Sequence, residues 1–233
     1  MNSVMQCLYS VDKLIANLPR AMSSDLNRSS PSKGLLTEST FFHSSYILEF
    51  WDLYQSFLNG ERSIRMSEFR SELVSVAPQF DNYDQHDGMD CLRSILDALH
   101  EDLNRINQRP VFTYSDKDAE ELSKLGSAML SWNRQKSISN SIVSDIFAGQ
   151  IESVIRCSTC GFESATYDAF FDLSVPIPKK NNLKLVDCIK DYTKIETLDA
   201  EWKCSKCNDI RVATKQVLIS KLPEILVIRM LPL

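Results

Sequence analysis

The chain has 233 residues, of which 43% are hydrophobic and 24% charged, and its formal net charge is -5. These values are typical of a globular protein with a core of ordinary size, and the acidic balance disfavours a nucleic-acid partner, which usually requires a basic face. No apolar run reaches the roughly 18–20 residues of a membrane span, and Asp12 and Lys13 interrupt the apolar start, so neither a membrane partner nor a signal peptide is expected.

The first helix is predicted at the very start of the chain. Apolar residues recur there in steps of three and four, the spacing of one buried helical face: Val4, Leu8, Val11, Ile15 and Leu18. We expect Pro19 to end this helix. Cys7 lies on or beside the buried face and is interpreted as a small core residue.

Four further helices are expected before residue 140. A serine-rich stretch from Arg20 to Thr40 lacks periodicity and is predicted to be a surface connection. The last helix is predicted from Asp118 to Trp132, with Ser115 and Asp118 as an acidic variant of the capping box. A strong amphipathic stripe runs through the third. The four predicted segments are 46–58, 66–78, 92–103 and 118–132.

The pattern changes after Ile142 from helices to strands. Segments 150–157, 170–178 and 211–219 have the composition or the alternation of strands, and "EILVIRM" is a continuous apolar run typical of a strand buried on both faces. A short helix over 183–192 is expected to turn Leu185 and Ile189 inward. A helical half followed by a strand-rich half predicts the α+β fold class.

Two CxxC pairs stand in the strand-rich half: Cys157 and Cys160 in "CSTCG", and Cys204 and Cys207 in "CSKCN". Zinc prefers four tetrahedral thiolate ligands, and each CxxC turn presents two of them to one ion. Gly161 permits the left-handed turn that such a knuckle often needs. Four cysteines leave no open position, so we expect one structural Zn²⁺ ion. The alternatives are a pair of buried thiols or a redox pair.

The remaining cysteines and histidines suggest no catalytic pair. Seven cysteines, an odd number, suit a reducing compartment better than a disulfide framework, so we expect the protein in the cytoplasm, the nucleus or both. Cys91 and Cys188 are interpreted as buried core residues and His43 as solvated. His100 is explained by packing or by a carboxylate neighbour, and His86 is poorly aligned with any cysteine.

Several blocks, in this order, resemble the ubiquitin-specific protease family over almost the whole chain. "MNSVMQCL" is similar to the end of that family's cysteine box, GNTCYMNSxxQxL. "YDQHDGMDCLRSILDALHEDLNR" is similar to its second block, YxQQDAQEFLxxLLDxLHEDLN. The segments that follow at the positions the family pattern expects are "NSIVSDIFAGQIESVIRCSTCGFES", "DLSVPIP", "WKCSKC" and "LPEILVIRM".

This resemblance implies an α+β, papain-like cysteine protease fold drawn as a hand. It implies one ubiquitin-specific-protease domain, with a helical thumb over residues 1–140 and with zinc-bearing β fingers and an incomplete palm sheet over residues 141–233. Ubiquitin or ubiquitinated proteins would be the partners. The reaction would be thiol-dependent isopeptide hydrolysis, in which a cysteine thiolate attacks, a histidine transfers the proton, and an Asp or Asn orients that histidine.

The same resemblance bears on whether the chain can catalyse. In the family pattern the nucleophile stands just before the residues that are here Met1 to Ser3, and the catalytic histidine follows "LPEILVIRM". We therefore interpret the chain as a catalytic domain cut at both ends, without a catalytic residue and inactive as printed. A non-catalytic ubiquitin-binding module is the alternative; a zinc-ribbon nucleic-acid binder and a plain scaffold are less favoured. An unpaired apolar strand near the end predicts poor solubility.

Gln85 and Asp87 match the Gln and Asp of QQDAQEF. The resemblance makes these residues contacts for the basic, extended tail of ubiquitin. His86 departs from the pattern by replacing its second glutamine. The alternative for Asp87 is that its side chain only caps the helix that follows.

Overall fold

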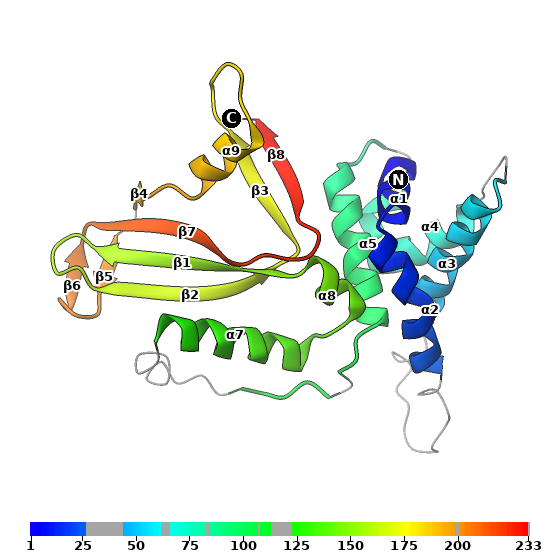
Figure 1. The fold of residues 1–233 in the computed structure, drawn as a ribbon, viewed down its shortest axis with the longest axis horizontal. Coiled ribbons are helices and arrows are strands. Elements are labelled where there is room, and N and C mark those ends of the chain that lie inside the picture. The colour runs from blue at the N-terminus through cyan, green and yellow to red at the C-terminus, as the bar shows by residue number, and fades with distance from the viewer. Residues whose placement is uncertain are drawn as a thin grey trace. The chain divides into compact units, whose positions relative to one another are not determined.

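The computed structural model describes residues 1–26, 44–61, 66–82, 84–106, 108–112, 123–198 and 201–232 (Figure 1). The chain divides into two compact units. The first, here called the helical unit, comprises residues 1–107 and 139–146. The second, here called the β unit, comprises residues 108–138 and 147–233. Within the described ranges, no helix combines the length and the hydropathy that crossing a bilayer requires.

The helical unit packs aromatic and aliphatic side chains from most of its helices into one core. Phe50 and Phe69 are fully buried with ring centroids 6.2 Å apart, and Tyr9 meets Phe50 edge-on at 5.5 Å. Such tilted and edge-on arrangements suit the quadrupoles of aromatic rings. The helices of this unit are α1 (Asn2–Tyr9), α2 (Asp12–Leu26), α3 (Ser44–Leu58), α4 (Ser67–Val76), the 3-10 turn η2 (Pro78–Phe80), α5 (Gly88–Asp102) and α8 (Ile142–Phe147) except for its last residue.

The single helix predicted at the start is two helices. The Ser10 hydroxyl donates a hydrogen bond to the Cys7 carbonyl at 2.7 Å, which offers the backbone an alternative to helix continuation. Pro19, predicted to end a helix, lies inside α2, which therefore extends into the stretch expected to be a connection. A proline ring has the φ that a helix needs and removes one hydrogen bond, a loss that packing of the helix can offset.

Burial in the helical unit confirms one prediction and corrects another. The stripe of α5 points inward as expected, with Ile95, Leu99 and Cys91 buried. Cys7 is exposed rather than buried, because the shorter α1 turns Met5 and Leu8 inward instead. The segment around His43 lies outside the described residues.

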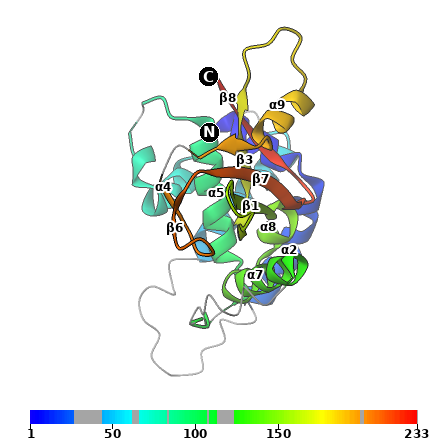
Figure 2. The ribbon, with the colours of Figure 1, turned by 90° about the vertical axis from the view of Figure 1, so that its left-hand side faces the viewer.

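The β unit is built on a four-stranded antiparallel sheet in the order β2-β1-β7-β4. Strands β3 and β8 form a separate parallel pair, and β5 and β6 form a short hairpin (Figures 1 and 2). The unit also contains two helices, α7 and α9. The bounds are α7 Lys124–Ile138, β1 Gly149–Cys157, β2 Glu163–Phe170, β3 Asp172–Ile177, α9 Leu185–Tyr192, β4 Glu196–Thr197, β5 Trp202–Cys204, β6 Asp209–Arg211, β7 Ala213–Lys221 and β8 Val227–Pro232.

Helix α7 lies along β2, at one side of the sheet (Figure 1). The Ser131 hydroxyl donates to the Tyr167 carbonyl of β2 at 2.7 Å, and Gln150 donates from β1 to the Ala128 carbonyl at 3.0 Å. The helix continues to Ile138, six residues beyond its predicted end, and Ser115 and Asp118 lie outside the described residues. A helix placed in this way covers part of an edge strand that would otherwise expose backbone groups.

Packing around α9 and β8 differs from the sequence pattern. Leu173 and Val175 of β3 are buried as predicted, but Leu185 is 49% exposed, and Cys188 takes the inward position with Leu183 and Tyr192 packed beside it.

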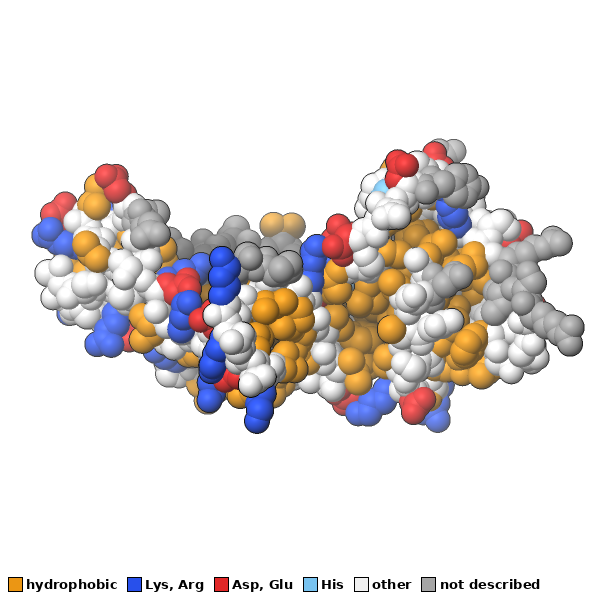
Figure 3. All heavy atoms as spheres, turned by 90° about the horizontal axis from the view of Figure 1, so that it is seen from above, with side chains coloured by type: hydrophobic (Ala, Val, Ile, Leu, Met, Phe, Trp, Pro, Cys, Tyr) orange, Lys and Arg blue, Asp and Glu red, His pale blue; other side chains and the backbone are white. Residues whose placement is uncertain are grey.

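The prediction that the strand of "EILVIRM" is buried on both faces is wrong for the described residues. Strand β8 pairs with β3 alone there, and its Met230 and Leu231 are exposed. The view from above shows hydrophobic side chains gathered on the surface (Figure 3).

Candidate metal centre and the loop before helix α5

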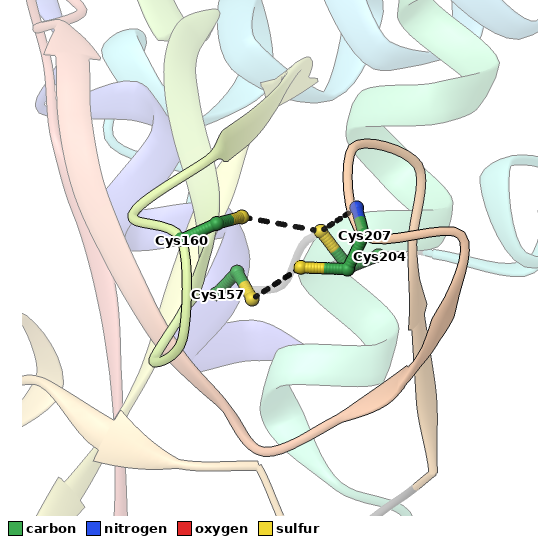
Figure 4. A group of neighbouring side chains, drawn as sticks. All are labelled: Cys157, Cys160, Cys204 and Cys207. Carbon is green, nitrogen blue, oxygen red and sulfur yellow. Dashed lines mark hydrogen bonds between the residues drawn. The ribbon is translucent and has the colours of Figure 1, made fainter.

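The four cysteines of the two CxxC pairs come together in the β unit (Figure 4). Cys157 and Cys160 flank the turn between β1 and β2, and Cys204 and Cys207 flank the turn between β5 and β6. The Sγ atoms of Cys160 and Cys204 are 3.6 Å apart, and those of Cys157 and Cys207 are 4.0 Å apart. All four Sγ atoms lie within 4.8 Å of one another.

The two knuckles have the same backbone design. In the first, the Gly161 N–H donates to the Cys157 carbonyl at 3.0 Å, and Gly161 has a φ of +70°. In the second, the Asn208 N–H donates to the Cys204 carbonyl at 2.8 Å, and Asn208 has a φ of +53°. Sequence reasoning identified Gly161 and missed Asn208, although asparagine is the residue after glycine that most readily adopts this left-handed conformation.

Strand pairing brings the knuckles together across the 43 residues that separate them in sequence. Strand β7 pairs with β1 along its length, so that Cys157 lies opposite Ala213. The Ser158 N–H then donates to the Val212 carbonyl at 3.0 Å, which joins the first knuckle to the chain leaving β6. The β1–β7 register therefore determines the distance between the two pairs of thiols.

This geometry fits a tetrahedral metal ion. Zn–S bonds of about 2.3 Å in a tetrahedron place the sulfur atoms about 3.8 Å apart, between the two distances observed. The backbone N–H of Cys160 lowers the pKa of the Cys157 thiol to about 6, which favours the thiolate that zinc requires. Hydrogen bonding to the Cys160 thiol, followed by burial, raises the pKa of the Cys207 thiol to about 12. The four cysteines could hold a structural zinc ion with no open position.

The second candidate site is the loop that enters α5 in the helical unit. The Asp87 carboxylate accepts hydrogen bonds from the N–H groups of Met89, at 2.7 Å, and Asp90, at 3.4 Å, and so forms the N-cap of α5. Gln85 is exposed. A cavity of about 250 Å³ adjoins the cap, and it is lined by Gln79, Phe80, His86, Asp87, Asp90, Arg93 and Ser94.

The histidines in the described residues and the buried Cys188 have the following surroundings. His100 is buried in the helical unit, as the packing alternative expects, with its ring nitrogens against the hydroxyls of Ser141, at 2.6 Å, and Ser139. The ring of His86 contacts the side-chain oxygen of Asn82 at 2.6 Å. Cys188 is fully buried, as predicted.

The sequence profile of one family, "Ubiquitin carboxyl-terminal hydrolase", matches residues 1–231. The chain is 31% identical over 237 residues to ubiquitin carboxyl-terminal hydrolase 2 of Homo sapiens, an alignment that covers 99% of this chain and 37% of that protein. It is 38% identical over 172 residues to the Gallus gallus protein of the same name, covering 72% of this chain and 48% of the relative. The chain thus spans less than half the length of these relatives.

Solved structures show the same fold. Ubp8 in the SAGA DUB module with Sgf11, Sus1 and Sgf73, bound to monoubiquitin, aligns with a TM-score of 0.65 over 99% of this chain and 45% of that chain, at 23% sequence identity. The same module bound to ubiquitin aldehyde aligns equally well, at 22% identity. The α+β fold predicted from the sequence is confirmed by these alignments.

Proposed function

Because the chain belongs to the ubiquitin carboxyl-terminal hydrolase family, we propose that it binds ubiquitin and ubiquitinated proteins in the service of protein deubiquitination. The family match over residues 1–231 is the observation that carries this proposal. The ubiquitin-bound state of the structurally similar Ubp8 module supports it. The four clustered thiols support a cytoplasmic or nuclear setting as part of this proposal, because a reducing compartment preserves thiols.

The acidic loop before α5 supports a role in binding ubiquitin. Asp81, Asp84 and Asp87 in this loop, together with Asp90 in the first turn of α5, place four carboxylates within ten residues that contain no lysine or arginine. The ubiquitin tail is basic and extended, so this loop has the complementary charge, and such complementarity favours association and correct orientation. We assign Gln85 and Asp87 to contacts with this tail.

The proposed zinc ion has a structural task. Cys157, Cys160, Cys204 and Cys207 would hold it, and as a closed four-thiolate centre it would fix the β5–β6 hairpin to the end of β1. This arrangement gives the tip of the β unit a defined shape for a protein partner. The ion would supply charge and rigidity but no bond-making chemistry.

We further propose that the printed chain binds ubiquitin without cleaving it. Four of its cysteines form the candidate metal centre, Cys91 and Cys188 are buried, and Cys7 lies on the exposed face of α1. Nucleophilic catalysis by a thiol requires a base within hydrogen-bond reach, and His86 and His100 contact Asn82 and two serines respectively.

An assay of the 233-residue chain separates these proposals. With ubiquitin linked at its C-terminus to a fluorogenic amide, we expect no alkylator-sensitive turnover: the rate should be the same with and without a thiol alkylator. Titration with fluorescently labelled ubiquitin is expected to give saturable binding. Alkylator-sensitive turnover would refute the proposed inactivity, whereas absence of both binding and turnover would favour a scaffold and overturn the proposed function.

The two roles of Asp87 are separable by substitution. Asp87→Ala removes the N-cap and is expected to reduce stability by about 1 kcal/mol, because two helical N–H groups lose their acceptor. Asp87→Asn keeps an N-cap acceptor and should preserve stability, yet it removes the charge proposed to face the ubiquitin tail. We therefore expect a weaker Kd for labelled ubiquitin in both variants, but a lower urea midpoint only in Asp87→Ala. Unchanged affinity in Asp87→Asn would leave Asp87 as a helix cap alone.

A further inference from the structure

A single nitrogen atom of Arg70 forms hydrogen bonds with three carbonyl groups of the loop before α5. This atom, Nη2, donates to the carbonyls of Phe80, at 3.2 Å, Asp81, at 2.6 Å, and Asn82, at 3.1 Å. Arg70 projects from α4, and its side chain is half-buried. These three consecutive carbonyls end η2 and begin the segment that leads to Gln85 and Asp87.

Further contacts connect the backbone held by Arg70 to the wall of the cavity beside Asp87. The Oδ1 atom of Asn82 accepts the Asp84 N–H at 3.2 Å and lies 2.6 Å from Nε2 of His86. The rings of Phe80 and His86 meet edge-on with their centroids 5.1 Å apart. Both rings line the 250 Å³ cavity. Arg70 therefore reaches one side of the cavity through the backbone that carries Phe80 and Asn82.

A positive charge suits this position for a physical reason. Three carbonyl oxygens that converge on one point repel one another unless a donor lies between them, and hydrogen bonds to a charged donor are stronger than those to a neutral one. The Nη2 amino group has two N–H groups for three carbonyl acceptors, so one N–H is shared between two carbonyls, and the permanent charge of the guanidinium strengthens each contact. Without such a donor, the converging carbonyls would turn towards water and the loop would lose its shape.

We infer that Arg70 is a positioning residue that holds the Phe80–Asn82 backbone, and through it His86 and the cavity wall, in the shape that binds ubiquitin. This inference rests on the proposed function for its consequence, but the ordering of the loop can be measured without ubiquitin. Arg70 acts through the loop rather than by touching the partner. The chemistry it serves is recognition of a basic, extended peptide by a preorganised acidic loop.

The test compares Arg70→Ala and Arg70→Lys with Arg105→Ala in the full 233-residue chain. Arg105 is a matched control, because its guanidinium also makes several contacts in the helical unit, at 3.0 Å to Asn140 and 2.7 Å to Asp145, away from this loop. In Arg70→Ala we expect faster amide hydrogen exchange at Phe80, Asp81 and Asp84, whose N–H groups are hydrogen-bonded. We also expect at least about tenfold weaker binding of labelled ubiquitin, since lost preorganisation lowers affinity. Arg70→Lys should lie between Ala and wild type, and Arg105→Ala should change neither quantity.

Hydrogen exchange and ubiquitin binding together distinguish a failure of the inference about Arg70 from a failure of the proposed function. Unchanged exchange at Phe80, Asp81 and Asp84 in Arg70→Ala overturns the inference whatever ubiquitin does. If exchange rises but ubiquitin binds Arg70→Ala and wild type equally, the positioning role for recognition is overturned while the proposed function stands. If wild type itself fails to bind ubiquitin, the proposed function fails, and faster exchange then shows only that Arg70 orders the loop. If Arg70→Ala and Arg105→Ala lose affinity equally, and if both losses follow the decrease in melting temperature, Arg70 only stabilises the fold and its positioning role is overturned.

Discussion

Replacing Cys204 with serine is expected to remove zinc from the protein and to unfold the tip of the β unit. A serine hydroxyl is a poor substitute for a thiolate ligand, so the ion would lose one of four bonds and the β5–β6 hairpin its attachment to β1. Closed zinc sites contribute on the order of 10 kcal/mol in small peptides, and the two strands of this hairpin are only three residues long.

Elemental analysis and thermal unfolding measure this effect. Wild type should carry one zinc per chain, and Cys204→Ser much less than one, with an earlier unfolding transition. Cys7→Ser is the matched control, because Cys7 is exposed on α1 and should leave both quantities unchanged. A folded wild-type chain without zinc, or a Cys204→Ser variant as stable as wild type, would contradict the proposed metal centre.

Truncating Phe50 is expected to cause a large loss of stability in the helical unit. Its side chain is fully buried and touches the rings of Tyr9 and Phe69, so Phe50→Ala removes apolar contact and leaves a cavity that these neighbours fill only in part. Substitutions of this kind cost about 3–5 kcal/mol. That amount is a large fraction of the roughly 5–15 kcal/mol by which native domains are stable.

Urea unfolding followed by far-ultraviolet circular dichroism tests this prediction. Leu58→Ala on the same helix is the control, since Leu58 is 57% exposed and its truncation should change the free energy of unfolding by less than about 0.5 kcal/mol. A midpoint for Phe50→Ala close to that of Leu58→Ala would show that the aromatic cluster is not the core of this unit.

Local patterns in the sequence predicted a large part of the fold. The apolar stripe of α5, the alternation of Leu173 and Val175, and both CxxC pairs were recognised correctly because each depends on spacing within one turn or one strand. The family resemblance, which several blocks carried together, was confirmed by the match over residues 1–231. These features repeat at short range, so they can be read without knowing what packs against them.

The errors arose where a contact outside the pattern decided the outcome. A hydroxyl from Ser10 ended the first helix, and the α2 backbone continued through Pro19. Leu185 stands outward because Cys188, with its neighbours, fills the space against β3. Helix periodicity alone does not choose between two adjacent faces when both carry apolar residues.

The sequence by itself indicated which residues could hold a metal ion, which helical faces are apolar, and to which family the chain belongs. Only the tertiary structure decided that the two knuckles meet, through the β1–β7 register, and that Arg70 gathers the carbonyls of the loop before α5. The physical reason is the range of the interaction. Residue spacing within one helix or turn can be recognised from a short stretch of sequence. Contacts between residues that are far apart in the sequence depend on how whole helices and strands pair and pack.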